Sequence, residues 1–222
     1  MAVNGIYMSL NGRYNIWYNF LKVEKFIKIL YNIGGKMYKL FLKNSFQDRN
    51  LNGDSKVWAN WQSNLSFKTC YFCSKNHGRI VEISFILNNA SINAHQNCKC
   101  IYVPARTKKV GSVTILGVNG ADVFLKYLGK LPDYYVTKDV AKKYGWKNFE
   151  GNLNEIFPNG IIGGDVFSND DSKLPDKNGR VWYEADINYT GGYRGKDRIL
   201  YSNDGLVFVT YDHYQTFYEV IF

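Results

Sequence analysis

The feature that most constrains the fold of this chain is a change of pattern near Gly160. Before it, residues 121–128 have the spacing of an amphipathic helix, and Gly129 is placed to end that helix. After it, residues 181–189 alternate between two faces, as a strand does. Three further strands are expected over residues 198–202, 206–211 and 214–221. Helices that precede hairpin-linked strands predict an α+β fold, with N-terminal helices packed on a segregated antiparallel β-sheet.

Two more short helices are expected before the strands begin. Thr137 is a good N-cap for a helix over residues 138–144, and Gly145 is placed to terminate it. Asn152 is placed to cap a third helix. Pro158 must end that helix, because proline lacks the N–H that a helix needs.

One strand carries a carboxylate on a defined face of the sheet. Alternation places Glu184 opposite Ala185 and Ile187, so it lies on the open face if those two residues fill the core. A strand carboxylate is commonly just solvated surface. Here Arg194 and Arg198 follow within one short connection, which favours a site.

The same half of the chain holds one candidate base, one candidate acid and three cations. Such a set is suited to cutting a phosphodiester without a metal. In RNA the 2′-hydroxyl would be the nucleophile, and Glu184 is the candidate base for its proton. Histidine suits protonation of the departing 5′-oxygen because its ordinary pKa lies near neutrality, and His213 is the candidate. Lys138, Arg194 and Arg198 would stabilise the charge of the phosphorane. No cofactor or metal is required for this catalysis.

Three stretches of the sequence point to one family. They read GGDVFSNDDSKLP, GRVWYEADINYTGGYRGKDRILYS and YDHYQTF. This text resembles the barnase family of small extracellular bacterial ribonucleases over residues 121–221, close to half of the chain. The resemblance implies a barnase-like fold and a metal-independent endoribonuclease. It implies cleavage of single-stranded RNA, preferably after guanosine, by transphosphorylation to a 2′,3′-cyclic phosphate.

The resemblance also implies roles for named residues. The catalytic residues would be Glu184, His213, Lys138, Arg194 and Arg198. Tyr214 would stack on the base. The guanine-binding loop falls on Phe167, Ser168, Asn169, Asp170 and Asp171. In that loop, backbone N–H groups would serve the guanine carbonyl and N7, and a carboxylate would accept from N1 and the 2-amino group.

Three positions depart from the family's pattern. Asp170 stands where the family has arginine, so a cation near the phosphate is lost. Asp171 stands where the family has glutamate and is one methylene shorter. Gly205 replaces a peripheral tryptophan. We expect weaker RNA affinity at a similar base preference.

The net charge of +9 is distributed unevenly along the chain. Residues 1–110 carry 16 Lys and Arg against 4 Asp and Glu, a balance of +12. Residues 111–222 carry 12 against 15, a balance of −3. Attraction of phosphate in the second half must therefore come from local placement of cations. The basic first half either helps to hold RNA, or is a solvated surface or a contact with an acidic partner.

Residues 1–50 are expected to be a helical segment, the remnant of a longer N-terminal region. Apolar residues recur at helical spacing over residues 14–47, with lysines between them. Charges interrupt residues 15–33, the most apolar stretch, so no membrane span is expected. No recognisable signal peptide is present. Either export uses another route or the chain is a fragment.

Residues 51–110 are expected to form a separate small Cys-rich region. Its candidate metal ligands are Cys70, Cys73, Cys98 and Cys100, with His77 and His95 nearby. A CxxC pair followed by a second close pair is compatible with structural zinc. Two disulfides are the alternative if the protein folds outside the cell, and free thiols are the third.

The Cys-rich region resembles part of phage Mu-type head morphogenesis proteins over residues 58–103, through CxxC, HG and HxxCxC elements. The resemblance implies delivery or structural attachment. Residues 111–222 would then be a ribonuclease domain that acts as a toxin, extracellular or delivered into target cells. An acidic, barstar-like inhibitor would protect the producing cell. The alternative is a prophage head or structural protein with an incidental nuclease tail.

Overall fold

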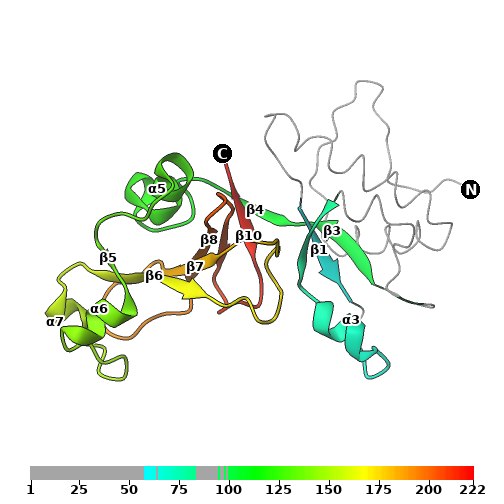
Figure 1. Ribbon diagram of the computed structural model, residues 1–222, viewed down its shortest axis with the longest axis horizontal. Helices are drawn as coiled ribbons and strands as arrows, with labels where there is room; N and C mark the ends of the chain where they lie inside the picture. The colour runs from blue at the N-terminus through cyan, green and yellow to red at the C-terminus, as the bar shows by residue number, and fades with distance from the viewer. Residues whose placement is uncertain (1–57, 64, 84–94, 96–97, 99) are drawn as a thin grey trace, which may run out of the picture. The chain divides into compact units, whose positions relative to one another are not determined.

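The second half of the chain forms most of a seven-stranded sheet (Figure 1). In spatial order its strands are β4 (Arg106–Lys109), β10 (Tyr218–Ile221), β9 (Val207–Thr210), β8 (Arg198–Ser202), β7 (Trp182–Asp186), β6 (Ile161–Phe167) and β5 (Tyr135–Val136). Neighbours from β10 to β6 pair antiparallel, which confirms the predicted sheet. The two edge pairings, β4 with β10 and β5 with β6, are parallel.

This computed structural model describes residues 58–222, apart from residues 64, 84–94, 96, 97 and 99. The helical segment predicted over residues 1–50 lies outside the described residues. The described residues all belong to one compact unit. None of their helices is long and apolar enough to cross a membrane.

The three predicted helices are present, as α5 (Ala121–Leu128), α6 (Lys138–Lys143) and α7 (Leu153–Ile156). Gly129 ends α5 in the left-handed conformation, with φ 69°. Thr137 caps α6, because its hydroxyl accepts a backbone N–H of the first turn. Asn152 stands at the start of α7 but caps it without a side-chain bond. Its carboxamide instead accepts from the N–H of Lys147 and donates to the carbonyl of Gly145.

One face of the sheet packs on α5. Ala185 and Ile187 lie in this core, as predicted, together with Ile199 of β8. Ala121 and Leu125 reach the same core from α5. Each fully buried aliphatic side chain of this size stabilises the fold by about 1.5–3 kcal/mol. The α5 contact therefore determines which face of β7 is buried and sends Glu184 to the other face.

The opposite face is only half open, which corrects the expectation for Glu184. On this face, side chains of the central strands and side chains from outside those strands form a second core. Its buried members are Trp58, Ile80, Ala105, Leu174, Trp182, Leu200, Phe208 and Phe217. Glu184 pairs in register with Leu200 and lies at the border of this core, with 7% of its surface exposed. Asp186 pairs with Arg198 in the next row of the same face. The face is thus divided into a covered apolar part and a polar part.

The Cys-rich region forms a second sheet. Its strands, in the order β2-β1-β3, are β1 (Trp58–Gln62), β2 (Ile80–Glu82) and β3 (Ile101–Pro104), and α3 (Tyr71–Asn76) lies between β1 and β2 in the chain. Trp58 and Ile80 are 3% and 1% exposed, because they pack in the core that contains Phe208 of β9.

The basic link expected over residues 106–111 contains strand β4, which is a further correction. β4 pairs in parallel with β10, and Figure 1 shows the two side by side. Lysine and arginine suit an edge strand, since they discourage pairing with other chains. Strand β4 and the side chains of Trp58 and Ile80 therefore contact the ribonuclease-like sheet by pairing and by a shared core. The domain boundaries predicted at residues 50 and 110 stay predictions.

Candidate active site

Glu184 lies in β7 between Asp165 of β6 and Leu200 of β8. Its side chain is 10% exposed, and both carboxylate oxygens are hydrogen-bonded. Nζ of Lys138 donates to Oε1, and the hydroxyl of Tyr214 donates to Oε2 at 2.5 Å. The fold thus brings together three of the residues predicted for the site, from a helix, a strand and a turn.

The surroundings of Glu184 keep it ionised. Burial by itself would raise its pKa, because a carboxylate loses hydration. The hydrogen bonds from Lys138 and Tyr214 and the charges of Lys138 and Arg194 outweigh burial, so the pKa lies below its ordinary value. Burial and the bond to Glu184 raise the pKa of Tyr214, which therefore keeps its proton. At neutral pH, Glu184 is a carboxylate that can accept a proton.

Asp186 forms ion pairs with both predicted arginines. Nε of Arg194 donates to Oδ2 at 2.6 Å, and Nη2 donates to Oδ1 at 2.7 Å. This two-pronged contact fixes the plane of the guanidinium. Nε of Arg198 lies 3.0 Å from Oδ1 of Asp186, without the alignment of a hydrogen bond. Burial would lower the pKa of Arg194, but the bond and charge of Asp186 raise it.

Arg198 is almost enclosed, with 5% of its side chain exposed. Its Nη1 donates to the carbonyls of Gly195 and Asp197, both at 2.8 Å. Arg194 is more open, at 17% of its side chain. Arg194 therefore presents its charge to solvent more directly, whereas Arg198 is held inside the site.

Lys138 is positioned by the start of α6. It is the first residue of that helix, and its N–H donates to both carboxylate oxygens of Asp165, each at 3.1 Å. A carboxylate at a helix N-terminus is stabilised by the unpaired N–H groups and the helix dipole. Asp165 pairs in register with Glu184 across strands β6 and β7. The start of α6 is therefore fixed next to the proposed base, Glu184.

His213 lies in the turn between β9 and β10, as predicted, and is exposed. Asp212 holds this turn. Its Oδ1 accepts from the N–H groups of Gln215 and Thr216, at 3.1 and 2.8 Å. Burial would raise the pKa of Asp212, but these N–H donors lower it. Asp212 therefore stays charged and keeps the turn that presents His213.

Tyr214 connects this turn to the rest of the site. Its N–H donates to Oγ1 of Thr210 at 3.0 Å, and its ring centroid lies 4.7 Å from that of His213. Its ring also stacks on Phe167, at 5.2 Å and 23°. His213 and Tyr214 both have left-handed backbone, with φ 57° and 68°, so the strand predicted to start at residue 214 begins at Tyr218.

The loop predicted to bind guanine leaves β6 at Phe167. Asn169 shapes it, because its backbone has φ 52° and its side chain closes onto Leu174. Oδ1 accepts from the N–H of Leu174, and Nδ2 donates to its carbonyl, both at 3.0 Å. The stack of Phe167 on Tyr214 places this loop next to the catalytic candidates.

Asp170 and Asp171 are exposed on the same loop. The hydroxyl of Ser168 donates to Oδ2 of Asp170 at 2.8 Å. Burial lowers the pKa of Lys173, and the charge of Asp171 opposes that effect. The loop therefore presents negative charge to an approaching ligand.

Comparison with known proteins matches residues 124–221 to the family model described as ribonuclease. A ribonuclease of Bacillus pumilus is 40% identical over 148 residues, which cover 62% of this chain and 91% of the relative. A ribonuclease of Heyndrickxia coagulans is 50% identical over 100 residues, covering 45% of this chain and 91% of the relative. The chain belongs to this ribonuclease family. A ribonuclease of Bacillus intermedius is also 50% identical over 100 residues, covering 45% of this chain and 61% of the relative.

Membership in the ribonuclease family confirms the barnase-like assignment of the second half of the chain. The resemblance of residues 58–103 to phage head proteins stays a prediction. The catalytic and binding roles of individual residues also stay predictions, since family membership assigns no role to a named side chain.

Three aspartates of this ribonuclease were not among the predicted site residues: Asp165, Asp186 and Asp212. Each holds a predicted residue in place rather than facing substrate itself. For Asp186 a signal existed, because alternation put it on the face of Glu184. Asp165 and Asp212 act through backbone N–H groups of a helix start and a turn, and only the tertiary structure shows those partners.

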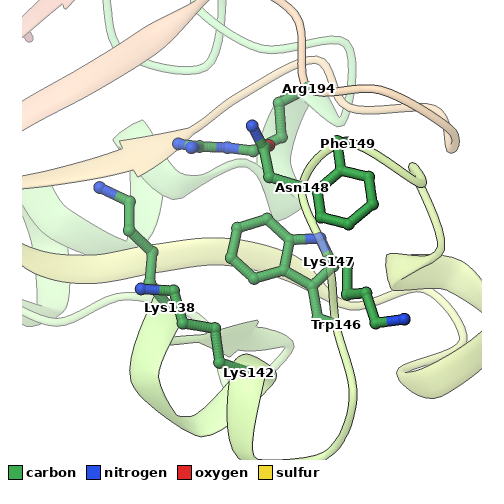
Figure 2. Close-up of a pocket in the computed structure, with 7 residues that line it drawn as sticks. All are labelled: Lys138, Lys142, Trp146, Lys147, Asn148, Phe149 and Arg194. Carbon is green, nitrogen blue, oxygen red and sulfur yellow. The ribbon is translucent and has the colours of Figure 1, made fainter.

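A pocket of about 400 Å³ adjoins the candidate catalytic residues of this ribonuclease (Figure 2). It is lined by Lys138, Lys142, Trp146, Lys147, Asn148, Phe149 and Arg194. Lys138 and Arg194 belong to both the pocket and the site of Glu184. The pocket combines four cationic side chains with an exposed aromatic ring, Phe149.

Within the described part of the chain, the groups of side chains that could hold a metal lie elsewhere, in the Cys-rich region. All four cysteines are free thiols in the structure. Cys70, Cys73 and His95 form one group of potential ligands, and Cys73, Cys98 and Cys100 form another. His77 is engaged differently, since its Nδ1 accepts from the N–H of Ser63 at 3.1 Å.

Proposed function

We propose that this ribonuclease cleaves single-stranded RNA, preferably after guanosine, by transphosphorylation and without a metal. One observation carries the proposal. The buried, ionised carboxylate of Glu184 and the two guanidinium groups paired with Asp186 occupy one polar face of the sheet. A base next to preorganised cations is what attack by the 2′-hydroxyl requires.

In the first step, Glu184 removes the 2′-hydroxyl proton, and the 2′-oxygen forms a bond to phosphorus. The bond from phosphorus to the 5′-oxygen breaks, and His213 gives its proton to that oxygen. The product is a 2′,3′-cyclic phosphate. In the second step a water replaces the 5′-oxygen, and the two residues exchange roles. Lys138 and Tyr214 must move from Glu184 toward substrate for this cycle to begin, because they occupy both carboxylate oxygens.

The equatorial phosphorane oxygens gain charge, and Lys138, Arg194 and Arg198 stabilise it. Preorganisation supports this role, since Asp186 holds the guanidinium of Arg194 in one plane before substrate arrives. Side chains thus supply both proton transfers and the charge stabilisation, so the reaction needs no metal.

Guanine binds at the loop from Phe167 to Asp171. Two features support the assignment. Asn169 has left-handed backbone, with φ 52°, and backbone turns that contain such a residue can bind acceptor atoms through their N–H groups. The stacked pair of Phe167 and Tyr214 offers a flat aromatic surface for the base. Asp171 is the carboxylate proposed to accept from N1 and the 2-amino group.

The RNA chain continues from the cleaved phosphate into the pocket of Figure 2. The pocket begins at Lys138 and Arg194, where the scissile phosphate is held. Lys142 and Lys147 lie beyond them, with side chains that are 63% and 55% exposed. These lysines bind the next phosphate, and the exposed ring of Phe149 stacks on a base.

We further propose that the enzyme acts as a toxin, extracellular or delivered into target cells, and that an acidic inhibitor protects the producing cell. The cationic cleft is local, since residues 111–222 carry a balance of −3. An acidic protein similar to barstar fits that cleft by replacing phosphate, with fast, salt-sensitive association. Barnase and barstar are the established example of such association, so this part of the proposal rests on analogy.

One experiment tests the enzymatic proposal. The full chain is incubated with single-stranded RNA in EDTA, and the cut ends are sequenced and tested for cyclic phosphate. We expect cleavage after guanosine, persisting in EDTA. Loss of turnover in EDTA that magnesium restores contradicts the metal-independent mechanism. The toxin proposal is tested by expression in a host without an inhibitor, where a folded, soluble wild-type chain that is harmless would contradict it.

A further inference from the structure

A cluster of thiols and one imidazole lies in the Cys-rich region, outside the proposed active site. Nε2 of His95 lies 3.1 Å from Sγ of Cys70 and 3.0 Å from Sγ of Cys73. Sγ of Cys73 lies 3.7 Å from Sγ of Cys98. The three short distances connect four side chains from two segments that are distant in sequence.

The ligand atoms of Cys70, Cys73 and His95 lie within 4.8 Å of one another, and Cys98 adjoins this group through Cys73. Zinc binds thiolate at about 2.3 Å and imidazole at about 2.0 Å, so two sulfurs in a tetrahedron lie about 3.8 Å apart. The 3.7 Å between Cys73 and Cys98 agrees with that value. The 3.1 and 3.0 Å from His95 to Cys70 and Cys73 are shorter than the roughly 3.6 Å of a nitrogen and a sulfur on one zinc ion, so zinc binding would move the imidazole outward by about half an ångström. A soft sulfur-rich set with one imidazole selects zinc over magnesium or calcium.

Local structure arranges the first pair of ligands. Cys70 is the N-cap of α3, and its sulfur accepts from the N–H of Cys73 at 3.4 Å. A cap and a residue of the first turn point to the same side of the helix start, which is how a CxxC pair is presented to a metal.

We infer that Cys70, Cys73, His95 and Cys98 bind one structural zinc ion. Two candidates remain. Cys100 lies within 4.8 Å of Cys73 and Cys98, but its thiol is 3.4 Å from the hydroxyl of Ser63, and we assign it to that contact. Nδ1 of His77 accepts from the N–H of Ser63. Four protein ligands fill the tetrahedron and leave no position for water or substrate, which makes the site structural and not catalytic.

We infer that the zinc site stabilises the proposed guanine-binding loop through the three-stranded sheet. The site links α3, which lies between β1 and β2 in the chain, to the residues just before β3. It therefore connects the segments that lead into the strands of the three-stranded sheet. The N–H of Ile80 in that sheet donates to the carbonyl of Lys173 at 2.7 Å, and Nζ of Lys173 donates to the carbonyl of His77. Leu174, whose backbone is hydrogen-bonded to the side chain of Asn169, packs in the core that contains Ile80.

Metal content tests the site without reference to catalysis. The full chain, purified under reducing conditions with zinc supplied, is analysed for bound zinc and for thiols titratable after denaturation. We expect one zinc per chain and four thiols. We expect Cys70→Ser and His95→Ala to lose the metal, while Cys100→Ser keeps it. Cys70 is exposed and caps α3, and serine is chosen because its hydroxyl can also accept from the N–H of Cys73.

The outcomes are distinct. A folded chain without zinc, or one without titratable thiols, overturns the metal site, and the latter indicates disulfides. Loss of zinc in Cys100→Ser with retention in His95→Ala overturns the ligand set. Circular dichroism of each variant shows whether the chain is still folded. Where His95→Ala unfolds, His95→Cys serves instead, since a fourth thiolate restores zinc binding if residue 95 is a ligand.

The bracing role rests on the proposed function and has its own readout. Zinc removal by a chelator should raise KM for guanosine-containing RNA about twofold to tenfold, the value of roughly one ordering contact, and leave kcat nearly unchanged. A fall in kcat at constant KM, or no change in either, overturns the brace. A chain that binds zinc but never cleaves RNA overturns the proposed function and leaves the metal site intact.

Discussion

The hydroxyl of Tyr214 donates to Oε2 of Glu184 at 2.5 Å, so the side chain proposed to stack on the base also holds the proposed general base. This bond lowers the pKa of Glu184, and the charge and bond of Lys138 act in the same direction. The base-binding surface and the proton-transfer group are therefore one hydrogen-bonded unit. A ligand that moves Tyr214 changes the basicity of Glu184.

Removing that hydroxyl should shift the acid limb of the activity profile. In Tyr214→Phe the stack on Phe167 remains, but Glu184 loses a donor that lowers its pKa. A carboxylate with a depressed pKa stays ionised to lower pH, so losing the donor moves the acid limb of kcat/KM to higher pH. A pH profile of RNA cleavage measures this. Tyr211→Phe is the control, since Tyr211 bonds the carbonyl of Val113 instead.

The two proposed proton-transfer residues should be individually essential for turnover. Glu184→Gln and His213→Ala should each reduce kcat by about 10²–10⁴-fold, because each removes one proton transfer. Glu184→Gln keeps the shape of the buried side chain, so folding is preserved. Thermal unfolding of both variants is the control. Cleavage by His213→Ala at the wild-type rate would sink the mechanism.

Replacing Asp186 should lower the free energy of unfolding. Asp186→Asn leaves Arg198, with a side chain 5% exposed, without its counter-charge. Breaking a buried ion pair in this way costs about 3–5 kcal/mol in the free energy of unfolding. Denaturant unfolding measures that loss. Asp139→Asn is the control, because its contact with Lys142 is 4.0 Å long and solvent-exposed, and we expect no measurable change. Equal effects of the two substitutions would contradict the buried role of Asp186.

The pocket beside the site should matter only for longer RNA. Lys142→Ala and Lys147→Ala should raise KM for an oligonucleotide but not for a dinucleotide, because both lysines lie beyond the scissile phosphate. Each lost phosphate contact should reduce the slope of log affinity against log salt by about 0.7. Lys143→Ala is the matched control on the same helix, since Lys143 does not line the pocket. An effect of Lys143 equal to that of Lys142 would mean general charge attraction.

The acidic loop should weaken RNA binding without changing the preferred base. Asp170→Arg should lower KM for RNA, because it replaces an exposed negative charge near the phosphate by a cation. The proposed base contacts come from backbone N–H groups and Asp171, so guanosine should remain the preferred nucleotide before the cut. Sequencing of cleavage ends for wild type and variant tests both statements. A shift to adenosine in either protein would refute the assignment of this loop.

The fold was predictable where local signals agreed. Gly129 and Thr137 mark helix ends through backbone conformation and capping, which depend on adjacent residues only. The strand over Arg198–Ser202 is found at its predicted bounds. Edge pairing was not predictable, because the parallel contact of β4 with β10 joins segments more than a hundred residues apart. No local pattern distinguishes a basic link from a basic edge strand.

The sequence by itself determined the residue types of the site and the face of β7 on which Glu184 lies, since a strand alternates with period two and Ala185 and Ile187 must be buried. Only the tertiary structure decided how those residues are held. Tyr214 reaches Glu184, and Asp165 reaches the N–H of Lys138, across contacts between separate elements. Only the tertiary structure also decided that Trp58 and Ile80 pack on this face of the sheet, because burial of apolar area selects partners by shape and not by position in the chain.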